Sequence, residues 1–233
     1  MIRLIKKWRR KHKNIKLINN TNNNISITPP QLLFNIKLDI VGNNNSIILK
    51  DLILDKNSLI NIYIRGDNNS IKITNSSISG NLSIKLGQLH KNFGPISNST
   101  FSIEENTSIE SLDYVTYNSN TNCRIGKNCM FSFDITIYNT DAHAILDYST
   151  NNLVNYVNDI KISDHCWIGK EVNILKNTYI PKDCIIGANS VVCGKLKKEH
   201  AIYAGNPAVL VKENRTWDSN GKKYGYIDNN PQI

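Results

Sequence analysis

Large aliphatic residues recur at every sixth position in the C-terminal half of the chain. The series runs Ile162, Ile168, Ile174, Ile180, Ile186 and Val192. An α-helix with about 3.6 residues per turn cannot hold this period on one face, and a simple alternating strand would not single out every sixth residue. The period instead indicates a β-helix, in which each hexapeptide forms one short strand and one corner. Three hexapeptides would complete a triangular coil of about 18 residues.

Smaller residues occupy the positions four places after most of these aliphatic residues, namely Val172, Thr178, Cys184 and Ser190. Gly169 and Gly187 directly follow two of the aliphatic residues, where the chain bends or another group approaches closely. We therefore predict that the aliphatic side chains point inward and stack from coil to coil, with the smaller residues near the corners.

The six-residue spacing also appears earlier in the chain, more loosely. The segment GNNNSI at 42–47 resembles GDNNSI at 66–71, and this offset of 24 residues corresponds to four hexapeptides. Asparagine suits the corners because it tolerates positive φ. We expect one continuous solenoid, with a separate small β domain over residues 20–105 as the alternative. The expected divisions are a basic segment (1–19), degenerate coils (20–120), a regular core (121–212) with a loop at about 138–160, and a tail (213–233).

Basic residues are concentrated at the N-terminus. The net charge is +9, and residues 1–16 hold eight Lys and Arg residues and no acid, which leaves about +1 for the rest. A basic tail on a nearly neutral body is weak evidence for nucleic acid, and we expect no nucleic-acid partner. Ile2, Ile5 and Trp8 are spaced for one face of a short helix, which would pack in an oligomer or rest on anionic lipid.

The five cysteines form no CxxC pair and show no zinc-site spacing. We interpret them as reduced, small apolar residues in a cytoplasmic protein and expect no metal.

The stretch NTDAHAILD at 139–147 interrupts the periodic pattern. It places a histidine between two aspartates in the segment predicted to leave the coil. Imidazole suits general-base chemistry near neutral pH, so His143 is a candidate catalytic residue. A solvent-exposed loop histidine without a function is the alternative that the residues alone leave open.

Residues 160–212 resemble the core of hexapeptide-repeat O-acetyltransferases through the segments CWIGKEVNIL, YIPKDCIIGANSVV and AGNPA. NTDAHAILD is similar to the D-x-H catalytic loop of the same family. Within the family, residues 120–215 most resemble the bacterial polysialic acid and capsular polysaccharide O-acetyltransferases. The Asn-rich N-terminal repeats share the general repeat pattern of the family but none of these motifs.

This resemblance implies a left-handed parallel β-helix, an all-β fold with the 138–160 segment as an excursion loop. It also implies a homotrimer with active sites between subunits, and acetyl-CoA as the acetyl donor. The expected acceptor is a hydroxyl group of a cell-surface polysaccharide, either a capsule, with sialic acid as one candidate, or lipopolysaccharide.

The resemblance assigns roles to residues near the loop. His143 would remove the hydroxyl proton, and Asp141, Asp147 or a backbone carbonyl would hold its tautomer. The Trp167 indole or a backbone N–H would stabilise the oxyanion. We also expect Asn139, Trp167 and Asp147 to contact the acceptor. His165, two residues before Trp167, is interpreted as a solvated corner residue.

The donor needs small residues beside its narrow pantetheine arm and cations at its phosphates. The small residues that we assign to this role are Gly169, Gly187, Ala188, Ala204 and Gly205. The candidate phosphate ligands are Lys212 and the cluster of Lys195, Lys197 and Lys198, with Lys195 and Lys212 as the leading pair. In the family AGNPA is often followed by Lys or Arg, but position 209 is Val.

Two other functions remain open at this point: N-acetylation of an amino sugar or nucleotide-sugar precursor, and a non-catalytic scaffold. The D-x-H loop argues against the scaffold, because a scaffold has no need to break its repeat there. We expect a cytoplasmic protein, with peripheral contact to the inner membrane through residues 1–16 as a second reading.

Overall fold

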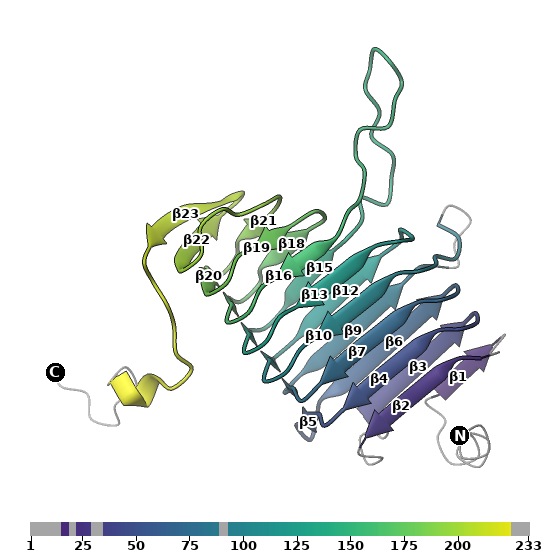
Figure 1. The fold of residues 1–233 in the computed structure, drawn as a ribbon, viewed down its shortest axis with the longest axis horizontal. Coiled ribbons are helices and arrows are strands. Elements are labelled where there is room, and N and C mark those ends of the chain that lie inside the picture. Colours follow the sequence, from purple (N-terminus) through teal and green to yellow (C-terminus); the bar gives the residue numbers. More distant parts are fainter. Residues whose placement is uncertain (1–14, 19–21, 29–34, 89–92, 225–233) are drawn as a thin grey trace.

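The computed structural model describes residues 15–18, 22–28, 35–88 and 93–224. Its short strands follow one another around three sheets, and the coil advances from β1 to β22 (Figure 1). Successive coils add strands in parallel to each sheet, so the chain forms a parallel β-helix. This confirms the fold class predicted from the six-residue period. The predicted N-terminal basic helix falls within residues 1–14, outside the described residues.

The first sheet contains eight strands: β1 (Ile15–Ile18), β3 (Ile36–Val41), β6 (Leu59–Arg65), β9 (Asn81–Leu86), β12 (Leu112–Thr116), β15 (Ile135–Tyr138), β18 (Asn173–Leu175) and β21 (Val191–Val192). The second contains seven: β2 (Asn24–Thr28), β4 (Ser46–Lys50), β7 (Ser70–Thr74), β10 (Thr100–Ile103), β13 (Asn122–Ile125), β16 (Ile160–Ile162) and β19 (Tyr179–Ile180). The third contains eight: β5 (Ile53–Leu54), β8 (Ser77–Ile78), β11 (Ser108–Ile109), β14 (Met130–Phe131), β17 (Trp167–Ile168), β20 (Cys184–Ile186), β22 (Ala201–Gly205) and the antiparallel β23 (Ala208–Glu213).

The periodic aliphatic residues stack inside the coil as predicted. Ile162 pairs with Ile180 in the second sheet, and Ile168 pairs with Ile186 in the third. Ile174 likewise pairs with Val192 in the first sheet, and the side chains of all six residues are fully buried. One step of six residues therefore moves the chain to the next sheet, and 18 residues return it to the same sheet. Each buried isoleucine stabilises the coil by about 1.5–3 kcal/mol.

The N-terminal coils are wider than the hexapeptide interpretation predicted. The 24-residue offset between Gly42 and Gly66 spans one coil rather than four hexapeptides, since Ile47 of β4 pairs with Ile71 of β7. The strands of these coils are five to seven residues long in the first two sheets, so a single turn needs more chain. The three sheets nevertheless continue without interruption into the C-terminal coils.

Asparagine residues form many of the corners. Asn44, Asn68, Asn98 and Asn120 all have φ between 55° and 58°, a region that asparagine enters more readily than most residues. Next to them, the Asn69 backbone N–H donates to the Asn45 side chain at 2.9 Å. The abundance of asparagine thus supports the corners directly.

The largest described excursion leaves the coil between β15 and β16 and projects far from it (Figure 1). It is a hairpin-like loop, closed by a bridge between Leu146 and Leu153. At the other end, the chain after β23 leaves the coil and reaches a short 3₁₀ helix, η2 (Gly221–Tyr224). No helix in the described parts of the chain is long and apolar enough to span a bilayer.

Candidate active site

The base of the excursion loop is fixed by polar contacts around Asp141. Lys176, just after β18, places its Nζ 2.6 Å from Asp141 Oδ2. The Asn155 side chain donates to Asp141 Oδ2 at 2.7 Å and to the His143 carbonyl at 2.8 Å. The loop therefore leaves the coil in a defined direction, and His143 lies on its fixed base.

His143 is exposed and lines an open cleft of about 560 Å³. Phe93, from the segment between β9 and β10, meets the imidazole edge-on at 5.9 Å and stacks on Tyr117 at 5.0 Å. Within the described part of the chain, neither imidazole nitrogen has a hydrogen-bond partner. Both nitrogens are thus available to a substrate.

The two aspartates that flank the histidine serve the loop itself. Burial raises the pKa of Asp141, but hydrogen bonds from Lys176 and Asn155 outweigh it and leave that pKa below its ordinary value. Asp147 accepts hydrogen bonds from both the backbone N–H and hydroxyl groups of Ser149 and Thr150, which lowers its pKa to about 2. In this structure neither carboxylate bonds to the imidazole.

Asn139, which we expected to contact the acceptor, is completely buried at the point where the chain leaves β15. Its side chain lies inside the coil rather than in the cleft. The position predicted for substrate contact is therefore an interior one in this structure.

Trp167 lies on the third sheet, outside the coil, with 37% of its surface exposed. No hydrogen bond involves its indole N–H within the described residues. His143 instead sits on the connection between the first and second sheets. One chain therefore carries the two predicted catalytic residues on different sides of the coil.

The small residues that we predicted to contact the acetyl donor lie on successive coils. A Cβ added to Gly169 would lie 2.7 Å from the Ala188 backbone nitrogen, and one added to Gly187 would lie 3.0 Å from Ala204 Cβ. Close packing between coils thus explains both glycines. Ala188 and Gly205 are exposed, so neither position presents a long side chain to solvent.

The two predicted phosphate ligands lie apart. Lys195 forms a bridge with Tyr179 of the second sheet, whereas Lys212 pairs with Ile202 in the third sheet. Lys198 forms an ion pair with Glu213 at 3.6 Å.

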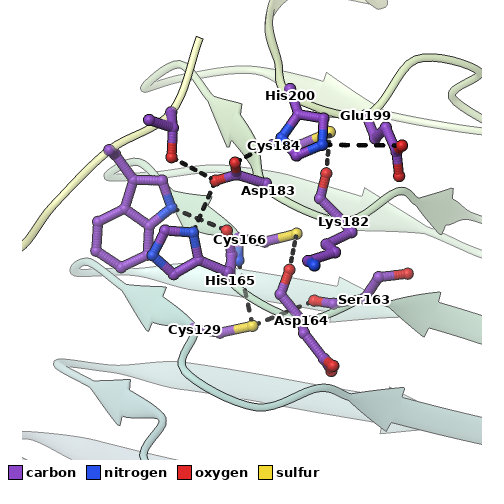
Figure 2. A network of polar contacts seen from close by, with 12 residues as sticks. Cys129, Ser163, Asp164, His165, Cys166, Lys182, Asp183, Cys184, Glu199 and His200 are labelled. Carbon is purple, nitrogen blue, oxygen red and sulfur yellow. Dashed lines mark hydrogen bonds and ion pairs between the residues drawn. The ribbon is translucent and has the colours of Figure 1, made fainter. Parts of the chain in front are cut away.

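Several residues at these positions carried no signal in the sequence. Lys176 and Asn155 fix the loop through contacts between segments that are distant in the chain, and no motif marks such pairs. Phe93 and Tyr117 come from different coils. His165, which we interpreted as a solvated corner residue, shares the Asp183 carboxylate with His200 (Figure 2).

No protein-family model matches the chain, but known proteins are similar to it. The polysialic acid O-acetyltransferase of Neisseria meningitidis is 29% identical over 201 residues, which cover 84% of this chain and 86% of that protein. The polysialic acid O-acetyltransferase of Escherichia coli O1:K1 is 31% identical over 96 residues, which cover 41% of this chain and 31% of that protein.

Two solved structures resemble the chain over most of its length. The polySia-specific acetyltransferase NeuO has a TM-score of 0.69 at 26% identity, covering 91% of this chain and 85% of that one. The polysialic acid O-acetyltransferase OatWY has a TM-score of 0.65 at 28% identity, covering 88% and 90%. The likeness thus extends well beyond residues 120–215, where the sequence motifs lie, and it confirms the resemblance predicted from them.

Proposed function

We propose that this protein, a hexapeptide-repeat acyltransferase that resembles the polysialic acid O-acetyltransferases, transfers acetyl from acetyl-CoA to a hydroxyl group of a cell-surface polysaccharide. The observation that carries the proposal is the likeness to the meningococcal enzyme over 84% of the chain. The exposed histidine in the cleft at the base of the loop supports it independently.

His143 is the general base of the proposed reaction. A sugar hydroxyl is a poor nucleophile until its proton is removed, and imidazole is suited to this step near neutral pH. A nitrogen of His143 takes the proton while the oxygen forms a bond to the thioester carbonyl. The carbon–sulfur bond then breaks, and the imidazolium returns the proton to the departing thiolate. No covalent enzyme intermediate is needed.

Trp167 completes the proposed site from a neighbouring copy of the chain. Its indole N–H has no partner among the described residues, so it is available to an oxyanion. His143 and Trp167 of one chain lie on different sides of the coil, whereas a homotrimer would bring the loop of one subunit to the third sheet of the next. Exposed apolar residues on the loop support such docking: Ile145, Leu146, Tyr148, Leu153, Val154 and Tyr156.

The donor would lie along the strip formed by Gly187, Ala188, Ala204 and Gly205. Lys212 lies in the same sheet as Trp167, and this supports it over Lys195 as the residue that meets the phosphates. A donor on this strip would carry its thioester toward Trp167.

Thiol release from acetyl-CoA provides the test. The purified protein is incubated with polysialic acid, neutral capsular polysaccharides, lipopolysaccharide and amino-sugar nucleotides, and the products are analysed by mass spectrometry and NMR. We expect an added acetyl group on a hydroxyl of a polysaccharide, removable by mild base. Acetylation of an amine would overturn the O-acetyltransferase assignment, and the absence of any acceptor-dependent thiol release would overturn the enzymatic function on this panel.

A further inference from the structure

A buried carboxylate links two histidines at one corner of the last coils. His165 Nδ1 and His200 Nδ1 each lie 2.7 Å from a different oxygen of Asp183 (Figure 2). Asp183 is only 7% exposed. All three residues occupy equivalent corners of successive coils and have φ between 52° and 57°. Burying a carboxylate is costly unless hydrogen bonds satisfy it, so this arrangement holds the three residues together.

The same carboxylate also binds the C-terminal tail. The Thr216 hydroxyl donates to Asp183 Oδ1 at 2.8 Å, and the next residue, Trp217, donates from Nε1 to the His165 carbonyl at 2.9 Å. The Trp217 ring stacks on the His165 ring, with 4.6 Å between centroids and 11° between planes. The Arg215 backbone N–H donates to the His200 carbonyl at 2.8 Å. We call this set of contacts the Asp183 clip.

Coil stacking alone does not require the clip. The corner below His165 is formed by Asn128, which reaches a φ of 55° with a side chain that cannot ionise. The clip instead fixes a residue from outside the coil. The centroid of the Trp217 ring lies 6.3 Å from that of Trp167, and the two ring planes are tilted by 48°. The tail thus supplies a second indole beside the one assigned to the oxyanion.

We propose that Trp217 is a positioning residue for Trp167 and that the Asp183 clip holds it in place. This proposal rests on the proposed function, because it assigns a role to a residue of that reaction. Trp167 is outside the coil and its side chain is not fixed by the core. Contact with a second ring, itself held by stacking on His165 and a hydrogen bond, restricts the orientations of the Trp167 indole. Catalysis by a hydrogen-bond donor depends on such pre-organisation.

The two histidines provide a matched comparison. His165→Ala removes the surface on which Trp217 stacks, whereas His200→Ala removes the other hydrogen bond to Asp183 and no direct contact of Trp217. The variants Asp183→Asn, Trp217→Ala and Trp217→Phe complete the set. The sequence contains three tryptophans. All variants are therefore made in a Trp8→Phe background, which leaves Trp167 and Trp217.

Two measurements are made on each full-length variant. One is the circular dichroism band that arises from coupling between the two indoles, and the other is kcat and KM with acetyl-CoA and the polysaccharide of the panel above that gives the highest rate. We expect Trp217→Ala, Asp183→Asn and His165→Ala to lose the coupled band and to lower kcat by about 10-fold or more, with KM for acetyl-CoA within about 2-fold. His200→Ala removes one hydrogen bond of the clip but no side-chain contact of Trp217, so it should keep more of the band and more of kcat than His165→Ala does. Trp217→Phe should restore most of the kcat lost in Trp217→Ala, because phenylalanine can still stack on His165.

An unchanged kcat in Trp217→Ala would overturn the proposal. Equal losses in His165→Ala and His200→Ala would also overturn it, since they would indicate general weakening of the corner. An inactive parent protein would overturn the proposed function instead. In that case the coupled band still tests the clip, which is refuted if Asp183→Asn and His165→Ala retain the band.

Discussion

The ammonium group of Lys176 lies 2.6 Å from the carboxylate of Asp141, and this ion pair joins the excursion loop to the next coil. The Lys176 side chain is 16% exposed and the Asp141 side chain is 30% exposed. Lys176 also donates to the Asn155 carbonyl at 3.0 Å on the returning side of the loop. One lysine therefore holds both ends of the segment that carries His143.

Replacing Lys176 should impair catalysis more than folding. In Lys176→Met the aliphatic stem is retained but the loop loses its cationic anchor, so we expect kcat to fall by about 10-fold through misplacement of His143. Steady-state kinetics and thermal unfolding would be measured together. Lys170→Met is the control, because Lys170 is exposed and, among the described residues, its ammonium group forms an ion pair with its sequence neighbour Glu171 at 2.9 Å. Equal activity in the two variants would contradict the anchoring role.

His143→Ala should abolish most turnover. Loss of a general base lowers the rate by about 10²–10⁴-fold, whereas an exposed side chain contributes little to stability. Acetyl-CoA binding, measured by calorimetry, and the oligomeric state should both be retained. Near-parental activity of His143→Ala would remove His143 from the mechanism.

Phe93 and Tyr117 should affect the acceptor rather than the donor. Their stacked rings line the cleft beside His143, and aromatic faces provide contact area for sugar rings. Tyr117→Ala should raise KM for the acceptor by about 10-fold while KM for acetyl-CoA stays constant. Tyr63→Ala, which alters a tyrosine of β6 that contacts Lys37, is the control. A parallel rise in both KM values would argue against an acceptor site.

The regular part of the fold could be predicted because its cause is local. Every sixth residue from Ile162 to Val192 had to be apolar to fill the coil, and this constraint is visible in a single sequence. The wider N-terminal coils were misjudged, because the number of residues per coil depends on strand length, and strand length is determined by pairing with neighbouring coils. For this reason the 24 residues between the Gly42 and Gly66 segments were interpreted as four hexapeptides, although they form one coil.

The candidate site was predictable only where a motif exists. His143 and Trp167 lie within recognisable segments. Asp141 was predicted to hold the tautomer of His143, but it bonds instead to Lys176, which is 35 positions away and belongs to the next coil. Asp183 resembles any corner residue in sequence, and its role depends on the return of Trp217 to the coil. Such contacts join residues that are far apart in the chain, and no local sequence pattern predicts which of these residues meet.

Gly169 should be required for coil stacking. A Cβ at this position would lie 2.7 Å from the Ala188 backbone nitrogen and 2.8 Å from the Ile186 carbonyl oxygen, so backbone atoms would have to move. Gly169→Ala should therefore lower the thermal midpoint by several degrees, as expected for overpacking. Gly94→Ala, where nothing lies within 4 Å of an added Cβ, should unfold like the parent. Equal midpoints for both variants would show that the coils can separate at little cost.

The clip should weaken in acid. Burial raises the pKa of Asp183, but hydrogen bonds from His200, Thr216 and His165 outweigh it and leave that pKa below its ordinary value. A carboxylate with a lowered pKa binds fewer protons in the folded state than in the unfolded state. Its contribution to stability is therefore complete above the unfolded pKa of about 3.9 and is lost as the pH falls through the folded pKa.

Asp183→Asn isolates this contribution, because asparagine is similar in size and cannot ionise. The parent should unfold at a higher temperature than Asp183→Asn at pH 7, and the difference should shrink as the pH is lowered below about 4. Asp147→Asn is the comparison: that carboxylate also has a lowered pKa, but it lies at the tip of the loop and does not contact Trp217. Tryptophan fluorescence is measured as well. The emission of Asp147→Asn should match that of the parent at every pH, whereas Asp183→Asn at pH 7 should show the emission of the acidified parent. A parent whose tryptophan emission does not change on acidification would contradict a clip that depends on the Asp183 charge.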